Sequence, residues 1–385
     1  MIKVSVFTAT RAEYGLLYWL LKELTDNPAF DMQLVVAGTH LSQEYGYTVD
    51  HIVADGFVPT EQINCLISSD TPQAITKSNS LVSLQLADYF ARERPDYFIV
   101  LGDRSELLSA CMAAVVAKVK IVHLHGGEVT EGAIDEYIRH AITKLADLHF
   151  TSTDEHRKRV VQMGELSSSV INCGALGIES IYRHKKFSLG ELESELNYNL
   201  DGNYFVIAYH PETQKREDNI QELLSAVEHY PEYKKVFIYP NADAMSRKII
   251  DAITDFSVKF PEQVLLVKSL KHPVYLSLVE NSDLFLGNSS SGVIEVPYLR
   301  TPTINVGDRQ RGRPMSSSVI NIDMDAKKIS KAIGLALSLE FKQQVSLASN
   351  IYGENMASRV IIKALAGAFD KNSQTKKFND LEFSL

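Results

Sequence analysis

The sequence predicts an α/β protein made of two doubly wound, Rossmann-like domains with a central cleft. Short, continuously apolar runs alternate with helix-sized segments along the chain, which is typical of parallel sheets covered by helices on both faces. The alternation occurs in two series, and a polar stretch at Ser188–Gly202 separates them. At 385 residues the chain is also too long for one core of ordinary size.

The first domain is expected to span residues 1–185. Its candidate strands are the apolar runs Val4–Thr8, Gln33–Val36, Tyr97–Leu101, Lys120–Leu124, Leu148–Thr151 and Val170–Cys173. The candidate helices between them are Gly15–Thr25, Gln73–Arg92, Glu106–Lys118, Ile134–Leu145 and Glu155–Met163. This regular alternation indicates a parallel sheet.

The second domain is expected to span residues 200–365. Its candidate strands are Phe205–Tyr209, Val236–Tyr239, Val264–Lys268, Leu284–Gly287 and Thr303–Val306. The last helix of this range could pack back on the first domain. Residues 371–385 are polar and charged, so we expect a loosely attached tail.

Composition excludes several classes of protein. The formal net charge of −9 argues against a protein that binds the nucleic acid backbone. No apolar run approaches the roughly 20 residues of a membrane span, and Met1–Phe7 has the pattern of a buried strand rather than a secretory signal. Cys65, Cys111 and Cys173 form no CxxC pair, so neither a disulfide framework nor a zinc site is indicated. We expect a cytoplasmic protein without a membrane or nucleic acid partner.

Ligands of open α/β sheets bind beyond the carboxyl ends of the strands, so polar residues at those positions are the candidates for function. The first such place is Thr8–Gly15, which lacks the GxGxxG fingerprint of dinucleotide binding. It carries Arg11 at a strand-to-helix turn, where backbone N–H groups favour anions. Arg11 is therefore a candidate for phosphate or nucleotide binding, or simply a surface residue at a helix start.

The second place is Gly102–Glu106, which follows the strand Tyr97–Leu101 and contains Asp103 and Arg104. Asp103 is either an acid or base that faces the cleft, or the first residue of a capping box with Glu106.

The third place, His123–Thr130, is the densest in titratable groups. It holds His125 and Glu128, and strand alternation would put His123 and His125 on the same side. Asp135 and Arg139 follow at a spacing that places them on one helix face, where they could pair. Zinc binding is an alternative, but the spacing is not HExxH. The cluster favours proton transfer chemistry.

The second domain offers a different kind of site at Gly287–Pro297. A strand there runs into small hydroxyl residues, including Ser289 and Ser290, and then into a helix. Free N–H groups and hydroxyls at such a place suit a diphosphate, and Glu295 could accept hydrogen bonds from ribose. The alternative is an N-capped helix with no ligand.

Three further segments follow strands of this domain. His210 comes directly after one strand and Asn241 follows the next. The segment Gly307–Arg313 carries three arginines, including Arg309 and Arg313, which would lie over an anionic ligand or form a solvated basic loop.

Eight motifs taken in order carry a resemblance to a known family. They are TATRAEYG, LGDR, HLHGGE, DEYIRHAITK, YHPET, PNAD, GNSSSGVIEVP and GDRQRGR. Together they resemble the hydrolysing UDP-N-acetylglucosamine 2-epimerases of bacterial sialic acid synthesis, over nearly the whole chain. The resemblance implies the glycosyltransferase-B architecture, a homodimer, and UDP held mainly by the carboxyl-terminal domain.

The resemblance also implies a UDP-sugar substrate and roles for particular residues. The implied nucleotide contacts are Arg11, His210, Asn241, Ser289, Ser290, Glu295 and Arg309. Asp103, Glu128 and Asp135 are implied to lie around the sugar. Arg104, Arg139 and Arg313 complete the set of candidates for substrate binding.

The implied reaction begins with removal of the proton at C2 of the sugar and anti elimination of UDP, which gives 2-acetamidoglucal. Water then adds, with protonation at C2 from the opposite face, and N-acetylmannosamine is released. The reaction requires a base, an acid and stabilisation of the leaving diphosphate, and it needs no metal or redox cofactor.

One position departs from a related branch. Non-hydrolysing relatives have an HxEAG-like pattern with an acid where this chain has His125, so the proton carrier could be His125 itself or Glu128. Three other hypotheses remain open: a UDP- or GDP-linked 2,4-diacetamido sugar as substrate, a retaining glycosyltransferase of the same fold, and a nucleotide-binding regulatory module without turnover.

Overall fold

The computed structural model describes residues 1–200, 203–212, 219–241, 243, 245–353, 356–369 and 376–382. The contacts within the chain divide it into two compact units. Unit 1 comprises Met1–Glu128, Asp135–Glu179 and Tyr352–Leu385. Unit 2 comprises Val129–Ile134 and Ser180–Ile351.

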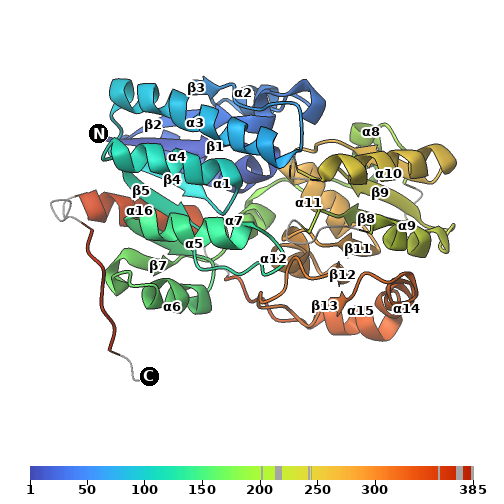
Figure 1. Cartoon of the computed structure of the whole chain (residues 1–385). Helices are drawn as coiled ribbons and strands as arrows, with labels where there is room; N and C mark the ends of the chain where they lie inside the picture. Colours follow the sequence, from blue (N-terminus) through green and yellow to red (C-terminus); the bar gives the residue numbers. More distant parts are fainter. Residues whose placement is uncertain are drawn as a thin grey trace. The chain divides into compact units, whose positions relative to one another are not determined.

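Unit 1 is built on a seven-stranded sheet in the order β3-β2-β1-β4-β5-β6-β7 (Figure 1). Its strands are β1 (Ile2–Thr8), β2 (Phe30–Ala37), β3 (Pro59–Ile63), β4 (Tyr97–Leu101), β5 (Lys120–Leu124), β6 (Leu148–Thr151) and β7 (Val170–Asn172). Every neighbouring pair is parallel. The strand order reverses between β1 and β4, which makes the carboxyl ends of these two strands the switch point where ligands of such sheets bind.

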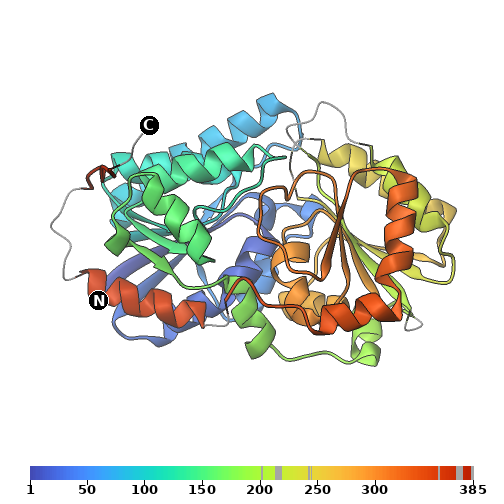
Figure 2. The same ribbon diagram turned by 90° about the horizontal axis from the view of Figure 1, so that it is seen from below.

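Helices cover both faces of this sheet. They are α1 (Arg11–Asp26), α2 (Val49–Ala54), α3 (Pro72–Glu93), α4 (Ser105–Val116), α5 (Asp135–Leu145), α6 (Asp154–Gln162), α7 (Leu176–Arg183), which runs into unit 2, and α16 (Ala357–Phe369). Figure 2 shows α3, α4 and α5 on one face and α1 and α16 on the other. In β1, Val4 and Val6 pack toward one face and Phe7 toward the other, so the strand buries apolar side chains on both faces of the sheet.

The carboxyl-terminal part of the chain belongs to unit 1. Helix α16 presents Ala357, Ile361 and Leu365, spaced four apart, to the core that contains α1. The expected second domain therefore ends at Ile351, before this helix, rather than at residue 365.

The described part of the expected tail, residues 376–382, lies against unit 1. The ammonium of Lys376 pairs with buried Glu165 at 2.8 Å, and the backbone N–H of Asn379 donates to the carbonyl of Gly164 at 2.9 Å. The Nζ of Lys144 lies 4.7 Å from the centre of the Phe378 ring. These contacts differ from the loose attachment expected from polarity alone, because Lys376 and Phe378 meet complementary partners that the local sequence does not show.

Unit 2 contains a six-stranded parallel sheet in the order β10-β9-β8-β11-β12-β13. Its strands are β8 (Tyr204–Ala208), β9 (Lys234–Ile238), β10 (Val264–Val267), β11 (Leu284–Gly287), β12 (Thr303–Val306) and β13 (Val319–Ile322). Counted from its own first strand, the order repeats that of the first six strands of unit 1. The edge strands β13 and, in unit 1, β3 were not predicted, because both are mainly half-exposed and lack a continuous apolar run.

Helices again cover both faces. They are α8 (Leu189–Leu196), α9 (Ile220–Glu228), α10 (Ser246–Lys259), α11 (His272–Glu280), α12 (Ser291–Ile294), α13 (Val296–Leu299), α14 (Ala326–Ala336) and α15 (Leu339–Ser346). The first of them lies inside the stretch expected to be only a polar connection. A capping box of Ser188 and Glu191 starts it, and its Leu192 is fully buried.

Gly287 brings two strand ends of unit 2 together. It has φ of 144°, and a Cβ at this position would lie 2.1 Å from the carbonyl oxygen of Ala208 at the end of β8. Only glycine permits this approach, which sets the segment after β11 at the switch point of the second sheet. The predicted class, two doubly wound parallel sheets, is confirmed. Among the described residues, no helix combines the length and apolar character needed to cross a bilayer.

Candidate active site

In unit 1, Asp103 lies directly beyond the carboxyl end of β4 and pairs with Arg139 of α5. It is not part of a capping box, because α4 begins at Ser105 with Arg104 at its N-cap position and no side-chain cap. The alternative interpretation of Asp103 as a helix cap is therefore wrong.

Arg139 joins three segments around this carboxylate. Its side chain is completely buried. Besides Asp103, it donates at 2.9 Å to the Glu136 carboxylate and at 2.9 Å to the backbone carbonyl of Glu128. The arginine thus fixes the end of β4, the loop after β5 and the first turn of α5, which starts at Asp135.

Glu128 is nearly fully buried and is held by two side chains. Its Oε1 accepts a hydrogen bond from Ser152 Oγ at 2.7 Å and lies 3.2 Å from His125 Nδ1. Ser152 Oγ is also 2.9 Å from His156 Nδ1. A buried carboxylate with such fixed neighbours has a defined orientation, as a proton-transfer group requires.

The contacts of His125 assign its tautomer. The backbone N–H of Leu176, the first residue of α7, donates to His125 Nε2 at 3.2 Å. Because a backbone N–H can only donate, Nε2 accepts and the ring proton of neutral His125 lies on Nδ1, facing Glu128. Protonation of Nε2 would break the bond to α7. The geometry therefore favours a histidine that orients Glu128.

His123 and His125 do not share a side of the strand as expected. β5 ends at Leu124, and His125 has a left-handed φ of 63°, so strand alternation does not extend to it. The ring of His123 is enclosed, with Nε2 at 2.8 Å from the Gly102 carbonyl and Nδ1 at 3.2 Å from Thr143 Oγ1. Burial lowers the pKa of His123 to about 3, which keeps the ring neutral at physiological pH.

Arg11 follows β1 and Arg104 follows β4, and Arg104 lies near the buried acids Glu13 and Glu106. Arg11 opens α1, its guanidinium lies 5.4 Å from the centre of the Tyr14 ring, and its buried Nε has no hydrogen-bond partner among the described residues. Arg104 Nε donates to Glu106 at 2.9 Å. Arg11 therefore keeps donor capacity for an anion.

Glu13 closes the first turn of α1 and gives a testable pH dependence. Its Oε2 accepts from the N–H groups of Ala9 and Thr10 at 2.9 and 3.1 Å. Burial raises the pKa of Glu13 to about 7 from an ordinary 4.5, with Arg104 opposing and Glu106 reinforcing the effect. The folded protein binds this proton more tightly than the unfolded chain does. Glu13 therefore makes the fold less stable as pH rises from about 4.5 to about 7.

We expect Glu13→Gln to remove this loss, because the amide oxygen still accepts both bonds and carries no charge. At pH 8 the variant should be more stable than the wild type by about 3 kcal/mol, and at pH 4.5 the two should be nearly equal. Trp19, the one tryptophan of the sequence, lies in α1 of unit 1, so its fluorescence during denaturation measures the relevant unit. An equal difference at both pH values would contradict the expectation.

In unit 2, fully buried Asn288 ties together the segments that follow three strands. Its side chain accepts from the His210 N–H at 2.7 Å and donates to the His210 carbonyl at 2.8 Å. Its carbonyl accepts from Arg309 Nη1 at 3.3 Å and from Gln310 Nε2 at 2.8 Å. The N–H of Asn241 donates to His210 Nδ1 at 3.4 Å. The structure thus brings His210, Asn241 and Arg309 to one place.

Ser289 and Ser290 follow Asn288 with partly exposed side chains. The helix after them is not simply N-capped, because Ser290, at the N-cap position of α12, makes no side-chain cap. Ser291 instead accepts a 2.8 Å hydrogen bond from Tyr275. Glu295 is buried between the short helices α12 and α13.

Arg313 differs in placement from the other predicted nucleotide contacts. It is largely buried, and its Nε donates to the carbonyl of Val129 at 2.9 Å. Arg311 is exposed and lies 3.8 Å from Asp308. The basic segment after β12 therefore divides into an arginine near Asn288, an exposed one and a buried one.

Several residues of these clusters were missed. Ser152 follows β6 directly and Asn288 follows β11 directly, so the strand-end rule, applied to every strand, would have found both. Glu212 Oε1 accepts from the N–H of Asp308 at 2.5 Å, a contact between distant segments that no local pattern signals. Within the described ranges, no three His, Cys, Asp or Glu side chains gather in a way that could hold a metal ion.

A family model described as UDP-N-acetylglucosamine 2-epimerase matches residues 22–366. The chain belongs to this epimerase family. It is 36% identical over 386 residues to the polysialic acid biosynthesis protein P7 of Escherichia coli, which covers 99% of this chain and 98% of that protein. It is 35% identical over 344 residues, 89% of each chain, to the GDP/UDP-N,N'-diacetylbacillosamine 2-epimerase (hydrolyzing) of Campylobacter jejuni.

The fold of the epimerase family is also found among solved structures. The UDP-GlcNAc 2-epimerase of Neisseria meningitidis, solved with UDP-GlcNAc bound, superposes with a TM-score of 0.79 at 17% identity, covering 95% of this chain and 100% of that one. This likeness confirms the predicted glycosyltransferase-B-like architecture of two α/β domains. Membership of the epimerase family decides against the glycosyltransferase hypothesis and the regulatory-module hypothesis.

Proposed function

We propose that this epimerase is a hydrolysing enzyme that converts UDP-N-acetylglucosamine and water to N-acetylmannosamine and UDP, for sialic acid synthesis. The observation that carries the proposal is a pair of fixed carboxylates beyond neighbouring strands of unit 1. Asp103 is held by Arg139, and Glu128 is held by Ser152 and His125. Removing a proton from C2 and returning one to its opposite face requires two such groups. The polysialic acid relative supports the biosynthetic role.

The proposed reaction starts when a carboxylate of unit 1 takes the C2 proton and the bond from C1 to the diphosphate breaks. UDP leaves, and the C1–C2 double bond of 2-acetamidoglucal forms. Water then adds its hydroxyl at C1 while a second acid protonates C2 from the other face. Asp103, Glu128 and Asp135 are the proposed proton carriers. Glu128 has the best-defined orientation of the three. Asp103, Asp135 or both act with it.

The proposed nucleotide ligands are mainly in unit 2. Arg309 lies at the carbonyl of Asn288, next to the partly exposed hydroxyls of Ser289 and Ser290. His210 and Asn241 lie in the same cluster. Arginine and hydroxyl donors stabilise the charge that develops on a leaving diphosphate. We assign Glu295 to the ribose and Arg11, with its unused Nε, to the diphosphate.

Incubation with UDP-N-acetylglucosamine in D₂O, without an acceptor, tests this proposal. NMR should show UDP and N-acetylmannosamine that carries deuterium at C2, because the added proton comes from a carrier that exchanges with solvent. Product with full protium at C2 would contradict the elimination route. Formation of UDP-N-acetylmannosamine without release of UDP would show a non-hydrolysing epimerase.

A second candidate substrate is a UDP- or GDP-linked 2,4-diacetamido sugar, on the way to a legionaminic-type acid. The activity in the name of the Campylobacter jejuni relative, which is 35% identical to this chain, favours it. The chemistry at C1 and C2 is unchanged, and only the substituents at C4 and C6 differ. Turnover of both sugars, measured side by side as kcat/KM, decides between them.

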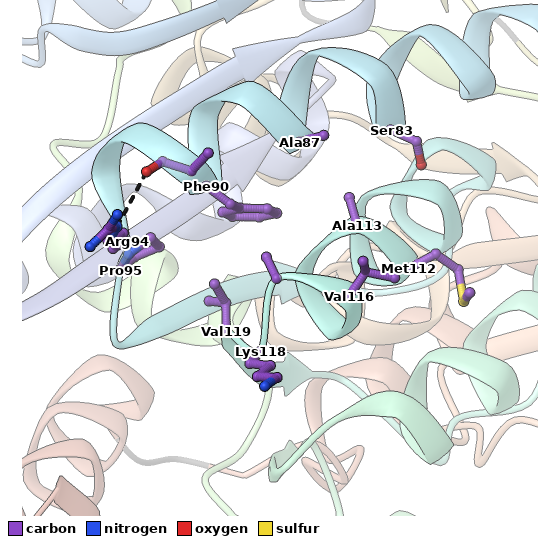
Figure 3. Close-up of a pocket in the computed structure, with 12 residues that line it drawn as sticks. Ser83, Ala87, Phe90, Arg94, Pro95, Met112, Ala113, Val116, Lys118 and Val119 are labelled. Carbon is purple, nitrogen blue, oxygen red and sulfur yellow. Dashed lines mark hydrogen bonds between the residues drawn. The ribbon is translucent and has the colours of Figure 1, made fainter.

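We further propose that the enzyme is a homodimer through an apolar face of unit 1 formed by α3 and α4. Val116, Leu84, Met112 and Val115 are exposed there, at 78%, 66%, 48% and 42%. Beside them lies a hollow of about 720 Å³ (Figure 3), lined in part by Phe90, Ala113 and Val119. An apolar patch of this kind marks an interaction surface.

A second copy is the partner that this α3–α4 face fits. A two-fold interface uses the same patch on both copies, so the patch must complement itself. Exposed Met112 and Val116 line the hollow (Figure 3) and can contact the hollow of the second copy. Arg94 and Lys118 line the hollow, and exposed Asp88 follows Ala87 of its lining in α3, so charges of both signs occur on this face. A face that carries both acidic and basic residues can form ion pairs with the same face of a second copy.

We expect Val116→Asp to convert the dimer to a monomer, because it would bury an unpaired charge in the interface. Sedimentation equilibrium measures the mass. Val258→Asp, at a 76% exposed position of α10, is the matched control and should leave the mass unchanged. A monomeric wild type, or a variant that remains dimeric, would contradict the assignment.

A further inference from the structure

A six-residue connection, Val129–Ile134, leaves unit 1 and packs within unit 2. The residues that flank it are Glu128 and Asp135, and both belong to unit 1. The proposed function places both among the proton carriers. The connection is well packed, since Val129, Thr130 and Ala133 are all buried. A short internal turn, in which the N–H of Ala133 donates to the Thr130 carbonyl at 3.0 Å, shapes it.

The partner of this connection in unit 2 is the arginine segment after β12. Arg313 Nε donates to the Val129 carbonyl at 2.9 Å, and the Glu131 N–H donates to the Arg311 carbonyl at 3.3 Å. A buried charge-assisted hydrogen bond to a backbone carbonyl fixes the chain more firmly than a surface ion pair does.

The two segments touch backbone to backbone. A Cβ on Gly132 would lie 2.8 Å from the Cα and N atoms of Arg309. These are backbone atoms, so a change of side-chain rotamer could not relieve the clash. On the other side, Gly312 has a φ of +85°, and a Cβ there would lie 2.5 Å from Val129 Cγ1. Glycine at both positions permits an approach that no other residue allows.

The same arginine segment is anchored to the proposed nucleotide cluster. Arg309 and Gln310 donate to the Asn288 carbonyl, and the Asp308 N–H donates to Glu212. The segment 308–313 thus contacts both Asn288 and the connection 129–134. A ligand that orders Arg309 orders the backbone against which Gly132 rests.

We propose that the connection 129–134 is a positioning element, and that Gly132 and Arg313 are positioning residues that link the nucleotide cluster of unit 2 to the placement of Glu128 and Asp135. This inference rests on the proposed function and adds a role that needs no contact with substrate. Because catalytic groups must be held closely, a displacement of about 1 Å at the ends of the connection costs roughly 100-fold in rate.

The experiment compares Gly132→Ala with Gly190→Ala in full-length protein. Gly190 lies in α8 of unit 2, and a Cβ there would meet nothing within 4 Å, so it is the matched control. We expect Gly132→Ala to lower kcat by roughly 10- to 100-fold. The Kd for UDP from calorimetry, the KM and the melting temperature should stay close to those of the control. Arg313→Lys retains the charge but loses the Nε donor. It should likewise lower kcat and leave the Kd for UDP, the KM and the melting temperature nearly unchanged.

Three outcomes decide the matter. A wild-type protein that releases UDP from neither candidate sugar refutes the proposed function itself. An active wild type with an equally active Gly132→Ala variant overturns the positioning role. Loss of UDP binding or of the fold in both Gly132→Ala and Arg313→Lys would also overturn it, because the connection would then only stabilise unit 2.

Discussion

Replacing Glu128 with glutamine is expected to lower turnover by roughly 10²- to 10⁴-fold while UDP still binds. Glutamine has nearly the same shape and can accept the hydrogen bond from Ser152, but it cannot take up or deliver a proton. Asp103→Asn and Asp135→Asn should have effects in the same range if these groups also carry protons. Glu155→Gln, at a 58% exposed position of α6, is the control that should retain full activity. Steady-state kcat and calorimetric UDP binding are the measurements.

Comparing the loss of turnover in His125 and Glu128 variants shows which of the two residues carries the proton. His125→Asn is the suitable change, because asparagine tolerates the left-handed φ of 63° better than most residues do. If His125 only orients Glu128, its loss should cost less than any carboxylate change. A loss as large as that of Glu128→Gln would instead make His125 the proton carrier. In that case His125→Glu, which restores the acid of the related non-hydrolysing branch, should recover part of the activity.

Arg139→Met is expected to lower the free energy of unfolding of unit 1 by about 3–5 kcal/mol. The guanidinium is completely buried, and its removal leaves Asp103 and Glu136 without their shared cation and the Glu128 carbonyl without its donor. Arg139→Lys should be almost as damaging, because one ammonium cannot span partners that two guanidinium nitrogens now reach. Denaturation followed by Trp19 fluorescence measures the effect.

A compensated variant separates charge from packing in this second prediction. Adding Asp103→Asn and Glu136→Gln to Arg139→Met removes the two negative charges that Arg139 neutralises and should restore a large part of the lost stability. It should not restore turnover, since Asp103 is then an amide. If the triple variant is as unstable as Arg139→Met, the loss comes from the cavity and not from unpaired charge.

The two parallel sheets and the segments that follow their central strands can be predicted from the amino-acid sequence alone. Continuous apolar runs such as Tyr97–Leu101 and Leu284–Gly287 can only be buried on both faces, and parallel strands bring their carboxyl ends to one edge. For this reason Asp103, Glu128, His210 and Ser290 were found as candidates without any knowledge of contacts. The edge strands and the docking of residues 376–382 could not be predicted in this way, because half-exposed or polar segments contain no continuous apolar run.

Which side chains contact one another is known only from the folded structure. Arg139 was predicted near Asp135, one helical turn away, yet the structure pairs it with Asp103, 36 residues earlier in the chain. The tautomer of His125 depends on the N–H of Leu176, and the need for glycine at position 132 depends on the backbone of Arg309. Short sequence patterns predict burial and backbone conformation, because these depend mainly on the residue type and its near neighbours in the chain. Pairing between distant residues depends on how the chain closes in space, and no local spacing records that.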